Sequence, residues 1–282
     1  IAFSDRASMS RLEGAHSCRQ GSPARRRAGS VSGGDDAIQG DKRRHVAYTP
    51  QAQKKQGFVS ESSCLCSPLL MPPVRQHVFE TDPALGANVL SVLHRIGQQS
   101  GPDLAKRLAL GQARTMLDLG GGAGTNAIAF CQVYPQLSAT VFDLQTTLPL
   151  TERTVKDAGL EGRISLKAGD FNRDSLGGPY DVVLMSDILH YQDLATNAAL
   201  VKKIYSHLNP GGRLIIKDRF LDASGTSPAW TAAFAVHILV NTEQGACYRT
   251  AEAMQWMHDG GYVSVEEIER TAVVQGVRPS VG

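Results

Sequence analysis

The amino-acid sequence predicts an α/β fold in which a doubly wound sheet of parallel strands is flanked by helices. Three observations point to it. Short apolar segments alternate with amphipathic segments of helical period over residues 115–217. Four glycines occur within residues 120–124, directly after the first apolar segment, and an aspartate lies at or near the end of each of the first three strands. Such alternation joins parallel strands through helices that cover both faces of the sheet.

Two apolar sets with helical spacing precede the first strand and predict two helices that lead into the core. The first set is Leu85, Val89, Val92, Leu93 and Ile96, and the second is Leu104, Leu108 and Leu110.

The elements that follow are assigned from their apolar period and their glycine boundaries. A late helix over residues 250–259 is closed by Gly260 and Gly261, and an edge strand follows at 263–268. The other expected strands are 115–119, 139–142, 164–168, 181–185 and 213–217, and the other expected helices are 126–133, 150–158 and 195–207.

Residues 1–75 lack this periodicity and are rich in Ser, Arg, Gly and Gln. Residues 1–60 hold 11 Lys and Arg against 5 Asp and Glu, whereas residues 61–282 hold 18 against 22. Too little apolar surface is available to offset the entropy of ordering, so we expect a disordered basic extension before a single domain at 76–282. Aromatic side chains that could stack on bases are nearly absent from it, which argues against nucleic acid as a partner.

The composition bounds the class of protein. With 42% hydrophobic and 20% charged residues, the chain is typical of a globular protein. Five cysteines are too few for a secreted disulfide framework, so we expect a cytoplasmic location, and Cys64 and Cys66 have no second pair at metal-ligand spacing. No apolar run approaches the roughly 18–20 residues of a membrane-spanning helix. We therefore expect neither a metal site nor a membrane partner.

The glycine cluster at the end of the first strand predicts a ligand-binding loop. Glycine permits positive φ and lets a ligand approach the backbone closely. The spacing of Gly122, Gly124 and Ala127, with Asp143 further on, also satisfies the dinucleotide fingerprint. The loop alone therefore leaves a nicotinamide cofactor, another nucleotide-like ligand and a ligand-free turn as alternatives.

Acidic residues at three successive strand ends narrow the choice to a nucleoside. Asp118 lies at the end of the first strand, and Asp143 and Asp170 close the next two. A carboxylate at the second strand end can accept both hydroxyls of a ribose, and one at the third can accept from an adenine amino group with Phe171 beside the ring. The alternative is three unrelated aspartates that cap helices or turns.

In their order, these motifs resemble the small-molecule O-methyltransferase family of the class I, Rossmann-like fold, which uses S-adenosylmethionine (SAM) and includes plant phenolic, acetylserotonin and hydroxyneurosporene enzymes. The resemblance implies that 76–282 is a catalytic domain, that SAM is the cofactor and that Asp118, Gly120, Gly122, Asp143, Leu144, Gly169, Asp170, Phe171 and Ser186 bind it. The motifs are Leu117-Asp-Leu-Gly-Gly-Gly-Ala-Gly124, Val141-Phe-Asp-Leu144, Ala168-Gly-Asp-Phe171, Ser186-Asp-Ile-Leu-His190, Asn209-Pro-Gly-Gly-Arg-Leu-Ile-Ile216 and Thr242-Glu-Gln-Gly245.

The resemblance also implies that His190 is the catalytic base and that Asp218 orients it. A hydroxyl that attacks the SAM methyl must lose its proton, and imidazole, with an unperturbed pKa near 6.5, suits that task at neutral pH. His190 follows the fourth strand, so we expect it on the same rim of the sheet as the glycine loop.

Several positions depart from the family pattern. Tyr248 stands where the family often has a second glutamate, which suggests substrate binding or help with a carbon or nitrogen acceptor, and the basic residue often found near Ser186 is absent. Residues 1–75 show no winged-helix dimerisation pattern, which leaves a homodimer through other surfaces as an alternative. The family lines its acceptor pocket with residues that follow the fifth strand. The corresponding residues here are Trp230, Phe234, His237, Met254 and Met257. The alternative is that these residues form the core face of a helix.

Three functions remain open from the sequence. The first is methyl transfer from SAM to a hydroxyl of a small aromatic or polycyclic metabolite. The second is an NAD(P)-dependent oxidoreductase, which the glycine fingerprint alone supports and which lacks a Tyr-x-x-x-Lys pair. The third is a protein that binds SAM without catalysis.

Overall fold

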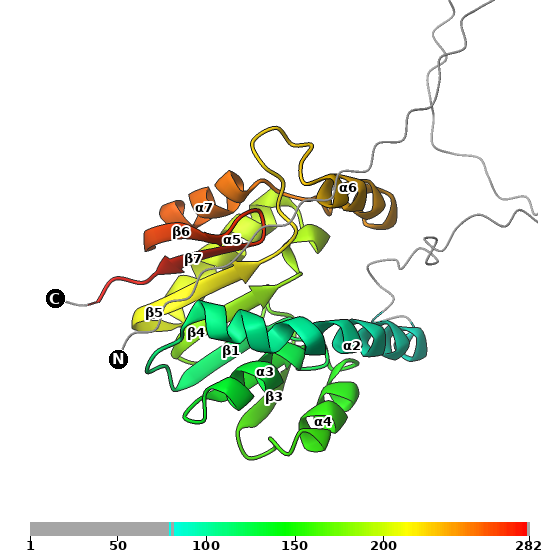
Figure 1. Ribbon diagram of the computed structural model, residues 1–282, viewed down its shortest axis with the longest axis vertical. Coiled ribbons are helices and arrows are strands. Elements are labelled where there is room, and N and C mark those ends of the chain that lie inside the picture. The colour runs from blue at the N-terminus through cyan, green and yellow to red at the C-terminus, as the bar shows by residue number, and fades with distance from the viewer. Residues whose placement is uncertain (1–78, 80–81, 281–282) are drawn as a thin grey trace, which may run out of the picture. The chain divides into compact units, whose positions relative to one another are not determined.

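A computed structural model describes Phe79 and residues 82–280 of the chain, so the predicted extension at 1–75 lies outside the described residues. Seven strands form one sheet in the order β3-β2-β1-β4-β5-β7-β6 (Figure 1). The first five strands in this order are parallel to one another, and β7 runs antiparallel to both β5 and β6. The predicted α/β fold is confirmed. The strands are β1 (Thr115–Leu119), β2 (Ser138–Asp143), β3 (Ile164–Ala168), β4 (Tyr180–Ser186), β5 (Leu208–Lys217), β6 (Val263–Glu269) and β7 (Val273–Val277).

Helices cover both faces of the sheet (Figure 1). On one face lie α2 (Pro83–Leu108), α3 (Thr125–Val133) and α4 (Leu148–Asp157), and on the other lie α5 (Leu194–Ser206) and α7 (Thr250–Asp259). A further helix, α6 (Ala229–Asn241), follows β5, and the short 3₁₀ turn η1 (Leu189–Tyr191) follows β4. No helix within the described residues is long and apolar enough to span a membrane.

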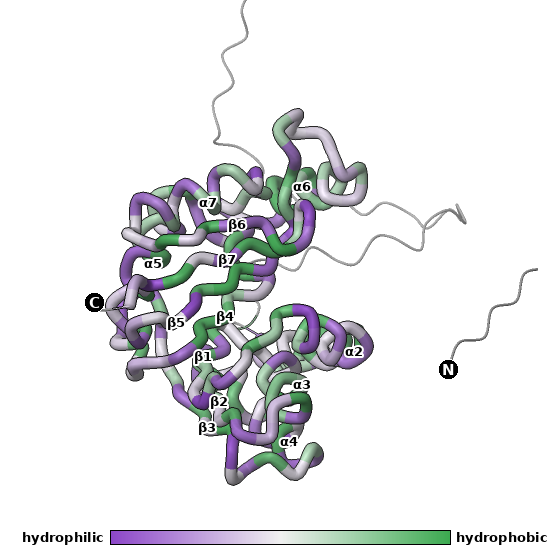
Figure 2. Tube along the Cα trace, turned by 60° about the vertical axis from the view of Figure 1, so that its left-hand side comes forward, coloured by the Kyte–Doolittle hydropathy of each residue, from purple (hydrophilic) through white to green (hydrophobic). Residues whose placement is uncertain are grey.

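Alternating strand residues build the two halves of the core. Met116 and Leu184 pack with the apolar side chains of α2 and α3, whereas Leu117 and Met185 pack with those of α5 and α7. All four are fully buried. This period of two is expected for strands with both faces covered, and Figure 2 shows the resulting hydrophobic concentration along the central strands.

The prediction of two helices before β1 is wrong, because α2 is one continuous helix. It begins at Pro83, where Oδ1 of Asp82 accepts a hydrogen bond from the N–H of Leu85 at 3.0 Å, and it runs on through Pro102. Proline removes one helical hydrogen bond, but packing of the flanking turn against α3 keeps the axis unbroken. Four apolar residues of its first half are exposed, namely Leu85, Val92, Leu93 and Ile96.

The sequence pattern did not predict strand β7 and helix α6. The strand β7 inserts between β5 and the correctly predicted edge strand β6 as part of a hairpin. Helix α6 has apolar residues all round, shown in green in Figure 2, but buries only Thr231 and Ile238. Without a polar face, its sequence carries no helical period to recognise.

The contact of α2 with α3 generates a test at Gly101. A Cβ at this position would lie 2.9 Å from Cβ of Ala129, so Gly101→Val should lower the free energy of unfolding by about 1–3 kcal/mol through overpacking. Gly162→Val is the matched control, because a Cβ there meets nothing within 4 Å. Denaturant unfolding of the two variants should separate them, and equal stabilities would contradict the close packing of α2 on α3.

Candidate active site

The glycine turn joins β1 to α3 at the carboxyl end of the sheet. Gly120, Gly122 and Gly124 have φ values of 66°, 55° and 73°, a region that residues with a side chain rarely adopt. A Cβ on Gly120 would also lie 2.7 Å from Cγ2 of Ile188, which follows β4. Glycine is therefore required here both by the backbone conformation and by the close approach of a neighbouring loop.

Asp143, the last residue of β2, holds this turn. Its Oδ2 accepts a hydrogen bond from the N–H of Gly122 at 2.7 Å, and its Oδ1 accepts one from the N–H of Leu144 at 2.7 Å. Burial raises the pKa of the carboxyl, and these backbone bonds oppose that rise. The structure thus brings Asp143, Leu144 and Gly122 together, and the carboxylate keeps lone pairs for the hydroxyls of a ligand.

Asp118 lies fully buried beneath the turn. Its Oδ2 accepts a hydrogen bond from the N–H of Ala127 at 3.0 Å, whereas its buried Oδ1 has no partner among the described residues. Burial raises the pKa of Asp118 to about 7, with the bond from Ala127 acting against the rise and the charge of Asp143 adding to it. A buried acceptor without a donor is rare, and here it lies directly under a turn built for close approach.

The loop after β3 brings Phe171 to the glycine turn, since Cε1 of Phe171 lies 3.6 Å from the position of a Cβ on Gly120. A Cβ on Gly169 would lie 2.6 Å from Oδ2 of Asp174, so this loop is also tightly folded. Asp170 is engaged locally: Oδ1 accepts from the N–H of Asn172 at 2.9 Å and Oδ2 pairs with Arg173 at 3.3 Å. These bonds shape the turn after β3, and the Asp170 side chain stays 42% exposed.

A cation at the end of β4 comes from the neighbouring strand. The register of β4 and β5 pairs Ser186 with Lys217, and the Lys217 Nζ lies 2.5 Å from Oδ2 of Asp187 and 3.4 Å from the Ser186 Oγ. Burial raises the pKa of Asp187, but the charge and hydrogen bond of Lys217 outweigh it and hold the pKa below its usual range. Spacing along the chain does not predict this basic group, because Lys217 is brought next to Ser186 only by the pairing of β4 with β5.

His190, carried by η1 and buried, contacts Asp218 at the end of β5. Its Nδ1 lies 2.7 Å from Oδ1 of Asp218. Asp218 is held in turn by two backbone donors, the N–H of Leu189 at 3.0 Å to Oδ2 and the N–H of Arg219 at 2.7 Å to Oδ1. The structure thus joins the two residues that the sequence analysis proposed as base and orienting acid, although they are 28 positions apart.

Aromatic rings surround His190. The ring of Tyr191 lies 4.4 Å from it, and Phe234 of α6 meets it edge-on at 5.1 Å, with His237 stacked behind Phe234 at 5.9 Å. Of the other candidates for an acceptor pocket, Trp230 is 60% exposed and Met257 is fully buried in the core. The interpretation as helix core therefore holds for Met257, whereas Phe234 lies beside the histidine.

Tyr248 does not face the site as the sequence analysis suggested. It is buried, its hydroxyl donates to the carbonyl oxygen of Gln192 at 2.5 Å, and its ring packs on Trp256. Burial raises the pKa of Tyr248 to about 12. Its hydroxyl therefore braces the segment after η1 and stays protonated.

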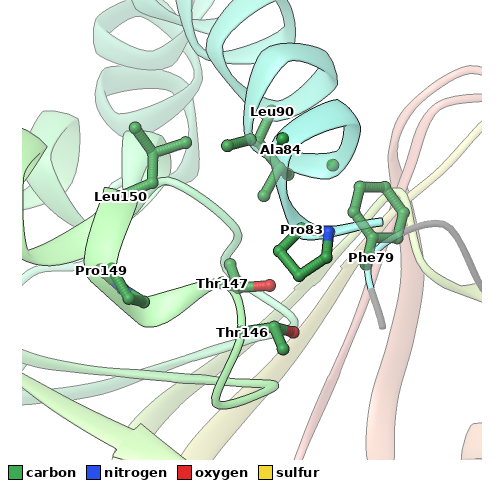
Figure 3. A pocket seen from close by; sticks show the side chains of 10 residues that line it. Phe79, Pro83, Ala84, Leu90, Thr146, Thr147, Pro149 and Leu150 are labelled. Atoms are coloured by element: carbon green, nitrogen blue, oxygen red, sulfur yellow. The ribbon is translucent and has the colours of Figure 1, made fainter. Parts of the chain in front are cut away.

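A cavity of about 330 Å³ lies between the start of α2 and the loop that leads from β2 into α4 (Figure 3). Its lining is mostly apolar and includes Phe79, Pro83, Leu90 and Leu150, with Thr147 at its edge. Leu90 also approaches the glycine turn, 3.3 Å from the position of a Cβ on Gly122. The cavity therefore adjoins the turn, and none of its lining residues belongs to the ring cluster around His190. Within the described residues, no group of three or more His, Cys, Asp or Glu is placed to hold a metal ion.

Comparisons with known proteins show which family the chain resembles. The chain is 34% identical over 180 residues to 3-hydroxy-5-methyl-1-naphthoate 3-O-methyltransferase of Streptomyces sahachiroi, covering 62% of this chain and 52% of that protein. It is similar to the solved structure of an O-methyltransferase family protein from Burkholderia thailandensis (28% identity, TM-score 0.67, 72% of this chain and 62% of the other). It is also similar to the S-adenosylmethionine-dependent methyltransferase SibL in its apo form (29% identity, TM-score 0.58, 66% and 57%).

The chain spans about half the length of the curated relatives that it matches. The model of the O-methyltransferase domain family matches residues 76–263, which is well over half of the sequence. On this match, the chain belongs to the O-methyltransferase domain family.

Proposed function

We propose that this protein transfers a methyl group from SAM to a hydroxyl of a small aromatic metabolite, with His190 as the general base. The observation that carries the proposal is the hydrogen bond between Nδ1 of His190 and Asp218, on the rim that also bears the glycine turn. Membership in the family supports this reaction over the oxidoreductase alternative.

The bond to Asp218 fixes which nitrogen of His190 can accept a proton. An ionised carboxylate can only accept hydrogen bonds, so Nδ1 carries the hydrogen and Nε2 keeps a free lone pair. No described residue donates to Nε2. When Nε2 takes a proton, the negative charge of Asp218 stabilises the imidazolium that forms. Asp218 is thus a positioning residue for His190.

The residues at the rim fit SAM. Oδ1 of Asp118 is a buried carboxyl oxygen without a partner among the described residues, and it lies beneath a turn whose glycines carry no side chains. Asp143 and Leu144 would hold the ribose, Gly169, Asp170 and Phe171 the adenine, and Asp118, Gly120, Gly122 and Ser186 the methionine portion. SAM, when bound, supplies a methyl group on a positively charged sulfur that retains the electron pair of the broken bond.

The chain's own residues perform the rest of the reaction. His190 would take the proton of the acceptor hydroxyl on Nε2 as that oxygen is methylated. Tyr191 and Phe234 flank the imidazole and favour a planar acceptor by ring packing, which also aligns the reacting oxygen. The similarity to a naphthoate O-methyltransferase supports an aromatic acceptor. A cytoplasmic location and a homodimer stay predictions.

Asp143→Ala tests the cofactor site. SAM binding should weaken by roughly 1–3 kcal/mol, because the ribose hydroxyls would lose a charge-assisted partner. Titration calorimetry with SAM measures the effect, and Asp157→Ala, an exposed aspartate of α4, is the control. Unchanged affinity in a folded variant would show that Asp143 serves only the turn.

Asp118→Asn tests the buried carboxyl through stability. Because the folded pKa of about 7 exceeds the ordinary value of 3.8, the group stabilises the fold below pH 4, and that stabilisation is lost as the pH rises to 7. The difference of about 3 pH units between the two pKa values corresponds to a loss of about 4 kcal/mol, at ~1.4 kcal/mol per pH unit. Denaturant unfolding at several pH values between 4 and 8 gives the free energy of unfolding as a function of pH. This free energy should fall less with pH in Asp118→Asn than in the unsubstituted protein, and it should fall equally in the exposed Asp103→Asn. The same pH dependence of the free energy of unfolding in Asp118→Asn and the unsubstituted protein would contradict a protonated Asp118.

His190→Gln tests the base. Turnover should fall by about 10²–10⁴, with SAM affinity unchanged, because glutamine cannot accept the proton at neutral pH. The rise of turnover with pH through the imidazole titration should disappear as well. Asp218→Asn should also slow turnover, since an amide that donates to Nδ1 forces the hydrogen onto Nε2.

His258→Gln on the exposed face of α7 is the control, and its turnover should match that of the unsubstituted protein. Near-normal turnover of His190→Gln on the true acceptor would mean catalysis by positioning alone. Loss of SAM binding in His190→Gln would make His190 structural.

A further inference from the structure

We propose that Arg219 selects acceptors that carry a carboxylate near the methylated hydroxyl. Its guanidinium has no ion-pair partner among the described residues and lies against the same ring that contacts His190. The inference rests on the proposed function and adds the chemical class of the acceptor, a hydroxyaryl carboxylate. Arg219 would then be a specificity-determining residue of the acceptor side.

The charges around His190 leave Arg219 without a partner. Lys217 is paired with Asp187 at 2.5 Å, and Asp218 is occupied by His190 and two backbone donors. The guanidinium of Arg219 makes no ion pair and no side-chain hydrogen bond within the described residues, and its Nε is buried without an acceptor. One positive charge at this rim is therefore uncompensated by a contact.

The backbone fixes where that charge lies. Arg219 directly follows Asp218, and its N–H binds the carboxylate that holds His190. Its Cζ lies 4.7 Å from the ring centroid of Phe234, and the same ring lies 5.1 Å from that of His190. The guanidinium and the base therefore share one aromatic neighbour. The charge of Arg219 also lowers the pKa values of Tyr191 and Cys247, which burial raises, so its field reaches both side chains.

The chemistry of a guanidinium favours a carboxylate as its partner. Its planar set of N–H donors matches the two oxygens of a carboxylate, and such a pair is stronger than a neutral hydrogen bond. An acceptor without an anionic group would leave the buried donor unpaired and would be disfavoured for that reason. The Phe234 ring contacts the guanidinium through a cation–π interaction, so the N–H groups are the donors that would bind the ligand.

A structural role for Arg219 is the competing explanation. The contact with Phe234 could serve only to hold α6, a helix that buries few residues of its own. In that case substitution would alter stability and the rates for all acceptors in proportion. The choice between acidic and neutral acceptors would stay the same.

The experiment compares two acceptors of the same shape, 3-hydroxy-2-naphthoic acid and its carboxamide, of which only the first carries a carboxylate. The full chain and its R219Q, R219K and R107Q variants are assayed, and the ratio of kcat/KM for acid over amide is measured. The ratio should fall about 10²-fold in R219Q and about 10-fold in R219K, which keeps the charge but not the planar fork. R107Q removes the same charge from the exposed Arg107 on α2 and should leave the ratio unaltered.

A second measurement does not need turnover. 2-Naphthoate has no hydroxyl to methylate, so its Kd is measured by calorimetry in the presence of S-adenosylhomocysteine. Binding should weaken about 10²-fold in R219Q and stay the same in R107Q. The Kd of 2-naphthoate can be measured even if a variant loses turnover for another reason. Circular dichroism shows whether each variant is folded.

The outcomes separate this inference from the proposed function. Equal acid-to-amide ratios and equal naphthoate affinities in R219Q and the unsubstituted protein would overturn the role of Arg219 while leaving methyl transfer intact. Naphthoate binding that depends on Arg219, with no methylation of either acceptor by the unsubstituted protein, would support the carboxylate site and count against the proposed reaction.

Discussion

The common direction of β1 to β5 is the constraint on which the rest of the structure depends. All five strands end at one edge of the sheet, and β1 lies between β2 and β4, so the loops after β1 and β4 leave on either side of a topological switch point. The glycine turn follows β1, and η1 with His190 lies just beyond β4. Groups far apart in sequence thereby reach one rim without any dedicated binding domain.

Residues at each strand end brace the loop of the neighbouring strand. Asp143 of β2 binds the turn after β1, Lys217 of β5 binds Asp187 after β4, and Asp218 beyond β5 binds both η1 and His190. These bonds are short and partly or fully buried, so the site's geometry is set by the sheet before a ligand arrives. A shift of register between β4 and β5 would disturb the cation and the histidine together.

The sequence predicted six of the seven strands and the rim on which the candidate residues lie, because each depends on local pattern. The glycine cluster, Asp143 and His190 lie directly after apolar strands, so their place at the rim followed from topology. Contacts between strands were harder to foresee: Lys217 reaches Asp187 only through the pairing of β4 with β5. The continuity of α2 through Pro102 depends on packing against α3, and the inward orientation of Tyr248 on the carbonyl of Gln192 depends on the fold around it. Period and spacing carry no information on any of these.

Core packing constrains the sequence of helix α6 less than it constrains the sequences of β1 and β4. Its side chains are mostly exposed, and only Thr231 and Ile238 are buried, yet it contributes Phe234 to the surroundings of His190. Mutations along this helix therefore carry little cost in core packing, whereas mutations in β1 or β4 disturb fully buried residues. Substitutions on α6 could therefore change the surroundings of His190 while the sheet and its rim stay the same.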